Sequence, residues 1–158
     1  MTEVEPQYPN YYSLNCAEIL IEDKAWLEIK GVDTVIKDIL AKILKNDENI
    51  SLLLTNDKNI KKLNYDFRNM DKPTNVLSFP SDDKDFLGDI AISINTLQKE
   101  SDEQDKDFMH HFIHMLVHGI LHLKGYDHIE ENEAEEMESH EIKILEDMGV
   151  KNPYIWAD

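Results

Sequence analysis

The chain has 158 residues, 31% of them charged and 41% hydrophobic, and a formal net charge of −17 at pH 7. This length fits one domain, spanning 1–158, with enough buried surface to be stable alone. The acidic start has no apolar segment, and no apolar run approaches the roughly 20 residues of a membrane span, so we expect a cytoplasmic protein without a membrane partner. Cys16 is the single cysteine, which excludes an intramolecular disulfide.

The first half of the chain predicts strands that alternate with helices. Residues 1–13 contain tyrosines and prolines without a hydrophobic period, so we expect a loose arm there. Asp33 or Thr34 can cap the first helix, and Asn56 or Asp57 can cap the second. Compact apolar runs predict the strands, and apolar residues at i, i+3, i+4 and i+7 predict the helices. The expected elements are strand 17–22, helix 34–45, strand 49–55 and helix 57–67.

The second half predicts two more strands and three more helices. Pro73 and Pro80 bound a strand, because proline ends helical conformation and cannot donate to a sheet. Asn95 can cap the next helix, the polar stretch 101–105 breaks it, and Gly149 ends the last helix. Four strands interleaved with five helical segments predict an α+β or α/β layered domain. The expected elements are strand 74–79, loop 81–86, strand 87–94 and helices 95–100, 106–124 and 130–148.

Three histidines near the end of the predicted helix 106–124 have the spacing of metal ligands. His118 and His122 are four residues apart, so they project from one helix face and can converge on one ion. Gly125 can take the left-handed conformation that ends a helix, after which His128 can close the site. Three neutral imidazoles suit Zn²⁺ and leave a fourth tetrahedral position open, as in catalytic zinc sites. The sequence therefore predicts a zinc site of His118, His122 and His128.

The same stretch matches the metalloprotease motif H-E-x-x-H-x-x-G-x-x-H in every position but one. Gly119 stands where the motif has its general-base glutamate, which counts against the alternative of a metzincin-like zinc peptidase. A mid-helix glycine costs roughly 1 kcal/mol relative to alanine, so its presence needs a reason. Our hypothesis is that the missing side chain leaves room for substrate near the metal. Close packing of the helix at Gly119 is the competing explanation.

Two segments resemble the YbeY family, bacterial zinc-dependent endoribonucleases implicated in ribosomal RNA maturation and ribosome quality control. They are HGILHLKGYDH at 118–128 and LNYDFRNMDKPTNVLSFP at 63–80, and the resemblance extends over about 63–154. It implies a roughly four-stranded mixed sheet flanked by about five helices. It also implies single-stranded RNA, with ribosomal RNA precursors, as substrate. Ribosomal small-subunit proteins or an assembly GTPase are open as further partners.

Arg68 and His114 are the candidate catalytic residues. Arg68 is the single arginine, and its planar fork of donors suits bidentate contact with a phosphate. The resemblance implies that Arg68 faces the metal cleft, whereas the residues alone leave open a surface arginine paired with Asp66 or Asp71. His114 shares the helical stripe of the zinc ligands and can hydrogen-bond the scissile phosphate or relay a proton. The alternative for His114 is a half-exposed histidine beside the cleft.

Two acidic residues stand out, each with more than one explanation. Asp89 either contacts a ligand imidazole, faces a partner, or lies in a simple turn or bulge. Glu141 falls on the helix stripe that should face the core, where a buried carboxylate needs a partner. That partner is either the zinc site or a lysine.

The charge distribution bears on whether RNA can bind at all. A net charge of −17 disfavours nonspecific attraction to phosphates. However, 57–72 contains five basic and three acidic residues, whereas 127–147 contains ten acidic residues and one lysine. An RNA strand should therefore be guided to one side of the molecule. The remaining alternative is a non-catalytic ribosome-assembly factor, in which zinc only holds a helix and a loop together.

Overall fold

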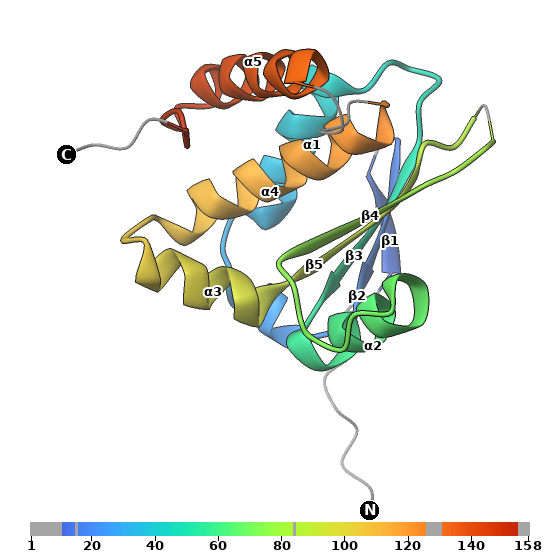
Figure 1. Ribbon diagram of the computed structural model, residues 1–158, viewed down its shortest axis with the longest axis vertical. Helices are drawn as coiled ribbons and strands as arrows, with labels where there is room; N and C mark the ends of the chain where they lie inside the picture. The colour runs from blue at the N-terminus through green and yellow to red at the C-terminus, as the bar shows by residue number, and fades with distance from the viewer. Residues whose placement is uncertain (1–10, 15, 84, 126–130, 155–158) are drawn as a thin grey trace, which may run out of the picture.

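The computed structural model describes residues 11–14, 16–83, 85–125 and 131–154 (Figure 1). Within them, five strands form one mixed sheet in the order β1-β2-β3-β5-β4. The central pairs β2/β3 and β3/β5 are parallel, and the edge pairs β1/β2 and β4/β5 are antiparallel. The strands are β1 Tyr11–Leu14, β2 Ala17–Ile21, β3 Ile50–Thr55, β4 Val76–Pro80 and β5 Gly88–Ser93.

Five α-helices and one short 3-10 helix occur in the described residues. In Figure 1, α1, α3, α4 and α5 gather on one side of the sheet, whereas α2 lies near the other side. No helix in this part of the chain combines the length and the apolar character that a membrane crossing requires. The helices are η1 Lys24–Glu28, α1 Val32–Ile43, α2 Asp57–Arg68, α3 Ile94–Glu103, α4 Phe108–Leu123 and α5 Glu131–Asp147.

The sheet buries side chains on both faces, which creates two cores. Successive side chains of a strand point to opposite faces. On β5, Ile90 and Ile92 belong to the large core that includes Phe112 and Leu116 of α4. Ala91, between them, belongs to a smaller core with Ile60 of α2. The α+β mixed fold that we predicted is thus confirmed, and α4 is the helix that the larger core holds against the sheet.

The predicted number of strands was one too few, because β1 lies in the segment that we expected to be a loose arm. Tyr11–Leu14 pairs with Ala17–Ile21 in a tight antiparallel register. Exposed and half-buried residues alternate along β1, so it lacks the apolar run that marks a buried strand. Backbone pairing at the sheet edge and the contact of the Tyr12 hydroxyl with the Asp33 carboxylate hold it in place. Residues 1–10 of the predicted arm lie outside the described residues.

Two predicted helix starts were also wrong. Helix α1 begins at Val32, and the residue before it, Gly31, has the positive φ of +86° that the turn into the helix requires. Asp33 and Thr34 lie inside the helix, so neither is its cap. Helix α3 begins at Ile94 and continues to Glu103, through part of the stretch that we expected to break it. The prediction for α2 is confirmed, because the Asn56 side chain accepts a hydrogen bond from the Asn59 backbone N–H at 2.9 Å.

Candidate metal centre

Helix α4 places His118 and His122 one turn apart at the edge of an open cleft. Their Nε2 atoms are 3.0 Å apart, and their rings are nearly perpendicular, at 79°. Two imidazole nitrogens bound to one tetrahedral zinc ion lie roughly 3.3 Å apart, given Zn–N bonds of about 2.0–2.1 Å. Gly125 follows the helix with φ of +99°, as its predicted role in ending the helix requires. The third predicted ligand, His128, lies outside the described residues.

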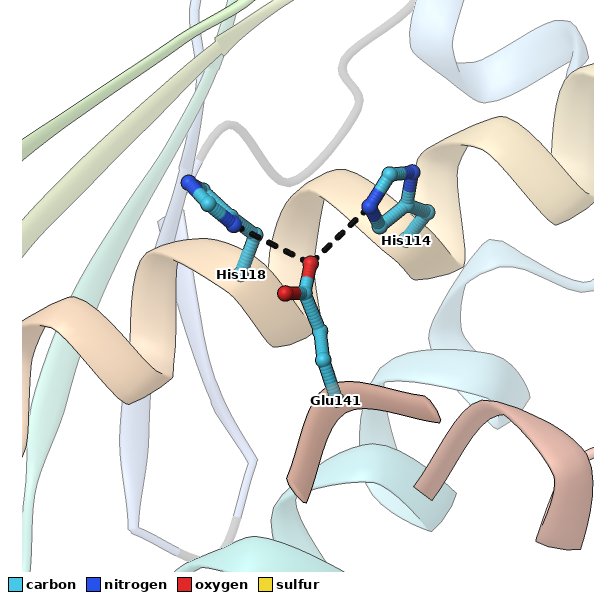
Figure 2. A group of neighbouring side chains, drawn as sticks. All are labelled: His114, His118 and Glu141. Carbon is cyan, nitrogen blue, oxygen red and sulfur yellow. Dashed lines mark hydrogen bonds and ion pairs between the residues drawn. The ribbon is translucent and has the colours of Figure 1, made fainter. Parts of the chain in front are cut away.

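Glu141 reaches from α5 to the opposite edge of the His118 ring (Figure 2). Its Oε1 accepts a hydrogen bond from Nδ1 of His118 at 3.0 Å and lies 2.9 Å from Nε2 of His114. The nitrogens and the carboxylate oxygen of these three residues lie within 4.8 Å of one another, so the group fits a metal ion. Of the two explanations for Glu141 from the sequence, the structure therefore supports the contact with the histidine site and not the lysine pair.

The Glu141 carboxylate is buried but ionised. Burial raises its pKa, but the imidazoles of His114 and His118 outweigh burial and hold the pKa of Glu141 at about 2. Its second oxygen, Oε2, accepts a hydrogen bond from the Tyr154 hydroxyl at 2.8 Å. Burial and the adjacent carboxylate in turn raise the pKa of Tyr154. The sequence had not singled out Tyr154, because a tyrosine in a C-terminal segment has no local pattern that points to a partner on another helix.

A cleft of about 640 Å³ is lined by the imidazoles of His118 and His122 and by Arg68. Arg68 is the last residue of α2 and belongs to the cleft wall. Asp66 and Asp71, which we had considered as its partners, pair instead with Lys62 and Lys61 at 3.0 and 3.8 Å. Among the residues that the structure describes, Arg68 makes no salt bridge. The full lining is Arg68, Asn75, Val76, Ser78, Pro80, His118, His122, Leu123 and Gly125.

Gly119 packs closely against two strands of the sheet. A Cβ atom built on it would lie 3.2 Å from Ser78 Oγ and 3.3 Å from Ile90 Cγ2, closer than ordinary van der Waals contact. Ser78 Oγ also donates a hydrogen bond to the Gly119 carbonyl oxygen, at 3.3 Å. Close packing of α4 on β4 and β5 therefore explains the glycine. Our hypothesis that its missing side chain leaves room for substrate stays a prediction, because Ser78 also lines the cleft.

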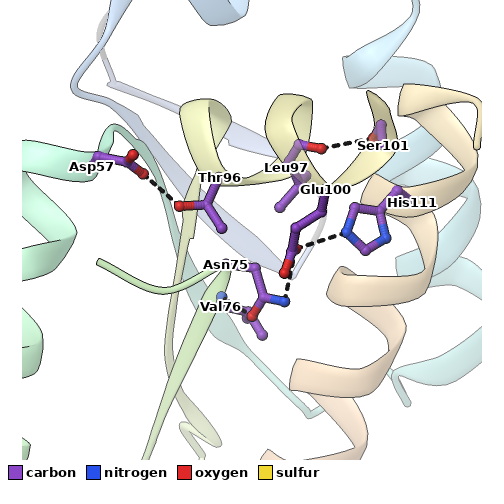
Figure 3. A network of polar contacts seen from close by, with 8 residues as sticks. All are labelled: Asp57, Asn75, Val76, Thr96, Leu97, Glu100, Ser101 and His111. Atoms are coloured by element: carbon purple, nitrogen blue, oxygen red, sulfur yellow. Dashed lines mark hydrogen bonds and ion pairs between the residues drawn. The ribbon is translucent and has the colours of Figure 1, made fainter. Parts of the chain in front are cut away.

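A second polar network lies on α4 one turn before His114 (Figure 3). Glu100 of α3 accepts hydrogen bonds from Nε2 of His111 at 2.9 Å and from Nδ2 of Asn75 at 3.0 Å. The Asn75 backbone carbonyl accepts from the Ser93 N–H, and Asn75 lies at the cleft. Burial, together with the charges of His114 and Lys106, lowers the pKa of His111, although the Glu100 carboxylate raises it. This network fixes the segment that leads into β4 beside the cleft.

Asp89 does not join the histidine cluster. It is an exposed residue of β5, paired across the sheet with Ser51 and Phe79. It lines a hollow beside Phe67 of α2, on the sheet face of the smaller core. Of the alternatives for Asp89, this position excludes contact with the imidazoles of His118 and His122, the two proposed ligands that the structure describes. The regular pairing of Gly88 and Asp89 with β4 also excludes a bulge there.

An imidazole–carboxylate group that fits a metal ion, beside a cleft with one arginine, is typical of metal-dependent hydrolases. The model of the family described as Endoribonuclease YbeY matches residues 19–149. The chain belongs to the YbeY endoribonuclease family. The match begins well before residue 63, so the likeness covers more of the chain than its two motifs indicated.

Individual relatives agree with this assignment. A protein of Bradyrhizobium sp. strain BTAi1 described as Endoribonuclease YbeY is 42% identical over 165 residues, covering 94% of this chain and 95% of its own. A protein of Sinorhizobium fredii with the same description is 41% identical, covering 87% and 90%. The solution structure of TM1509 from Thermotoga maritima superimposes with a TM-score of 0.60 at 31% identity, covering 81% of this chain and 87% of that one.

Proposed function

We propose that this chain is a zinc-dependent endoribonuclease that cleaves single-stranded RNA in the cytoplasm, with ribosomal RNA precursors as substrate. The observation that carries the proposal is that Arg68, His118 and His122 line one cleft, although Arg68 lies about fifty residues before the histidines. A guanidinium beside two convergent imidazoles is suited to a phosphodiester, because it can neutralise charge that grows on the phosphate. The related proteins of Bradyrhizobium and Sinorhizobium fredii are described as the same class of enzyme.

His118, His122 and His128 are the proposed zinc ligands. Imidazole nitrogens are suitable donors for zinc, and the separation of the two Nε2 atoms is close to what one ion requires. Zinc bound there would supply Lewis acidity toward a phosphoryl oxygen. Arg68 would hold the scissile phosphate in the cleft through its fork of donors. The catalytic role of His114 stays a prediction, and in the structure its Nε2 faces Glu141.

The basic residues of α2 and the turn after it explain how an acidic protein can bind RNA. A chain with net charge −17 repels phosphates at a distance, so the strand must approach where the local charge is positive. Arg68 ends α2 at the cleft, which places this segment next to the proposed site. The basic residues of the segment are Lys58, Lys61, Lys62, Arg68 and Lys72. RNA is therefore expected to run along α2 into the cleft, away from the acidic helix α5.

The peptidase alternative is not favoured. Gly119 occupies the position of the general-base glutamate in the metalloprotease motif, and it packs against Ser78 and Ile90 of the sheet. The chain therefore lacks the side chain that acts as general base in that motif. Ribosomal small-subunit proteins or an assembly GTPase remain predicted partners, and the assembly-factor alternative is left to the experiment.

The test compares cleavage of an unstructured RNA by the zinc-loaded protein with cleavage after chelation and after zinc is restored. We expect endonucleolytic products only with zinc, and no cleavage of an unfolded casein-like polypeptide. Cleavage of the polypeptide but not of RNA would establish the peptidase. Failure to cut either substrate, also with ribosomal particles supplied, would establish the assembly factor.

A further inference from the structure

Glu141 is an unusual residue for the centre of a helix interface. Its side chain is completely buried between α5 and α4, where an isolated carboxylate costs several kcal/mol. Its described hydrogen bonds come from Nδ1 of His118 at Oε1 and from the Tyr154 hydroxyl at Oε2, and Nε2 of His114 lies 2.9 Å from Oε1. A carboxylate that is kept at this cost, and hydrogen-bonded to an imidazole of the cleft wall, points to a role in the histidine site.

The His118 ring decides what that role is. Its two nitrogens lie on opposite edges: Nδ1 faces Glu141, and Nε2 faces Nε2 of His122. The Tyr154 hydroxyl donates to Oε2 and Oε1 accepts the hydrogen bond from the ring, so Nδ1 of His118 carries the proton. In a neutral imidazole the lone pair is then on Nε2, directed toward His122 and the cleft. Glu141 thus selects the tautomer that a metal between His118 and His122 requires.

Tyr154 holds the carboxylate in this orientation. Its hydroxyl donates to Oε2, which leaves Oε1 for the two imidazoles. Its ring also packs edge-on against the His114 ring, with centroids 6.0 Å apart at 85°. Tyr154 comes five residues after Gly149, which ends α5, so the segment after the helix is tied to the cluster by one side chain.

We propose that Glu141 and Tyr154 are positioning residues of the metal centre: Tyr154 orients the Glu141 carboxylate, and Glu141 orients His118 as a ligand through Nε2. On this assignment Glu141 is not itself a metal ligand, although its oxygen lies close to two imidazoles. The inference rests on the proposed function only in taking His118 and His122 as zinc ligands. Its tests are zinc affinity and imidazole tautomer, so they do not depend on RNA cleavage.

The first test measures the zinc affinity of Glu141→Gln and Tyr154→Phe by competition with a chromophoric chelator. Glutamine keeps the shape but accepts a weaker hydrogen bond, so we expect zinc affinity to fall about 10- to 100-fold. Tyr154→Phe removes a hydrogen bond to Glu141 and not to a proposed ligand, so it should lower the zinc affinity by only roughly three- to tenfold. Thermal unfolding of the metal-free variants checks that they are folded.

The chain offers matched controls for both changes. Glu100→Gln alters the other carboxylate–imidazole pair of α4, in which a part-buried carboxylate of α3 contacts His111 and not a proposed ligand. Tyr12→Phe removes a hydroxyl–carboxylate contact to Asp33, on α1. Both controls should bind zinc as the wild type does, even where they unfold at a lower temperature. Equal losses of affinity in a control and its matched variant would overturn the proposal.

The second test reads the His118 tautomer directly in the metal-free, ¹⁵N-labelled protein by long-range ¹H–¹⁵N spectra. We expect the Nδ1–H form in the wild type and a mixture of both forms in Glu141→Gln. Wild-type zinc affinity in Glu141→Gln would overturn the proposal. Loss of zinc in Glu141→Gln together with full zinc in His122→Ala would also overturn it, because Glu141 would then be a ligand.

These outcomes separate the inference from the proposed function. A wild type that binds zinc but cleaves no RNA would disprove the endoribonuclease, while the affinity differences would still support the positioning role. A wild type that cleaves RNA, with Glu141→Gln unchanged in affinity and tautomer, would disprove the positioning role alone.

Discussion

Helix α4 contributes the imidazoles of two similar carboxylate–imidazole pairs, which differ in the surroundings of the second ring nitrogen. His111 pairs with Glu100 of α3, and His118 pairs with Glu141 of α5, at 2.9 and 3.0 Å. The free nitrogen of His111, Nδ1, is buried and has no hydrogen-bond partner in the described residues. The other nitrogen of His118 faces His122 at the cleft, and 22% of its side chain is exposed. On our proposal, the same kind of pair stabilises packing at one end of α4 and orients a metal ligand at the other.

The largest expected difference between the two ends is in zinc binding. His122→Ala should lower bound zinc well below one equivalent per chain by elemental analysis, because it removes one of three proposed ligands. His111→Gln should keep the full equivalent and lower the melting temperature, since it disturbs only the packing pair. A full equivalent of zinc in His122→Ala would contradict the three-histidine assignment. It would also mean that the two ends of α4 do not differ in zinc binding.

Arg68→Lys should separate chemistry from metal binding at the cleft end. A point charge replaces a bidentate fork, and loss of one transition-state donor commonly costs on the order of 10²-fold in rate. We expect that loss in cleavage of single-stranded RNA, with zinc content and melting temperature unchanged. Lys37→Ala, an exposed change on α1 remote from the cleft lining, is the control and should cleave normally. Equal rates for Arg68→Lys and the wild type would show that Arg68 does not contact the phosphate.

Gly119→Ala tests the contact of α4 with the sheet beside the His118 pair. Overpacking costs roughly 1–3 kcal/mol, which should exceed the roughly 1 kcal/mol that alanine gains in a helix. We therefore expect a melting temperature a few degrees lower, measured by circular dichroism. Ser78→Ala in the same chain removes the nearest atom, at 3.2 Å, and should recover part of the loss. An increase in melting temperature on Gly119→Ala would mean that the sheet side chains move aside freely.

The smallest expected effect is the pH dependence at the packing end. Burial lowers the pKa of His111 below its ordinary value of 6.5, so the unfolded chain takes up this proton more readily than the folded one. The contribution of neutral His111 to the free energy of unfolding is fully present above about pH 6.5. It is lost as the pH falls, by at most about 1.4 kcal/mol per pH unit. Urea unfolding between pH 8 and pH 5.5 should show a steeper decrease for the wild type than for His111→Gln. Parallel curves would contradict a neutral His111.

The sequence by itself determined the features that depend on near neighbours along the chain. The spacing of His118 and His122 set their convergence, because positions four apart share a helix face whatever the tertiary structure. Gly125 and Gly149 ended the helices at the predicted places through their positive φ angles. The apolar runs of β3 and β5 marked the buried strands, so the α+β class was also predictable.

Only the tertiary structure decided which distant residues meet at the site. Arg68 reaches the histidine cleft because α2 ends where β4 and α4 form the walls of the cleft. The close packing of Gly119 on the sheet sets how near α4 lies to β4. Glu141 meets His118 through the packing of α5 on α4, and Tyr154, beyond the end of α5, meets Glu141. No local period encodes such contacts, because each depends on how separate elements dock through their cores. The edge strand β1 escaped prediction for a related reason, since backbone pairing with β2 holds it and not an apolar pattern of its own.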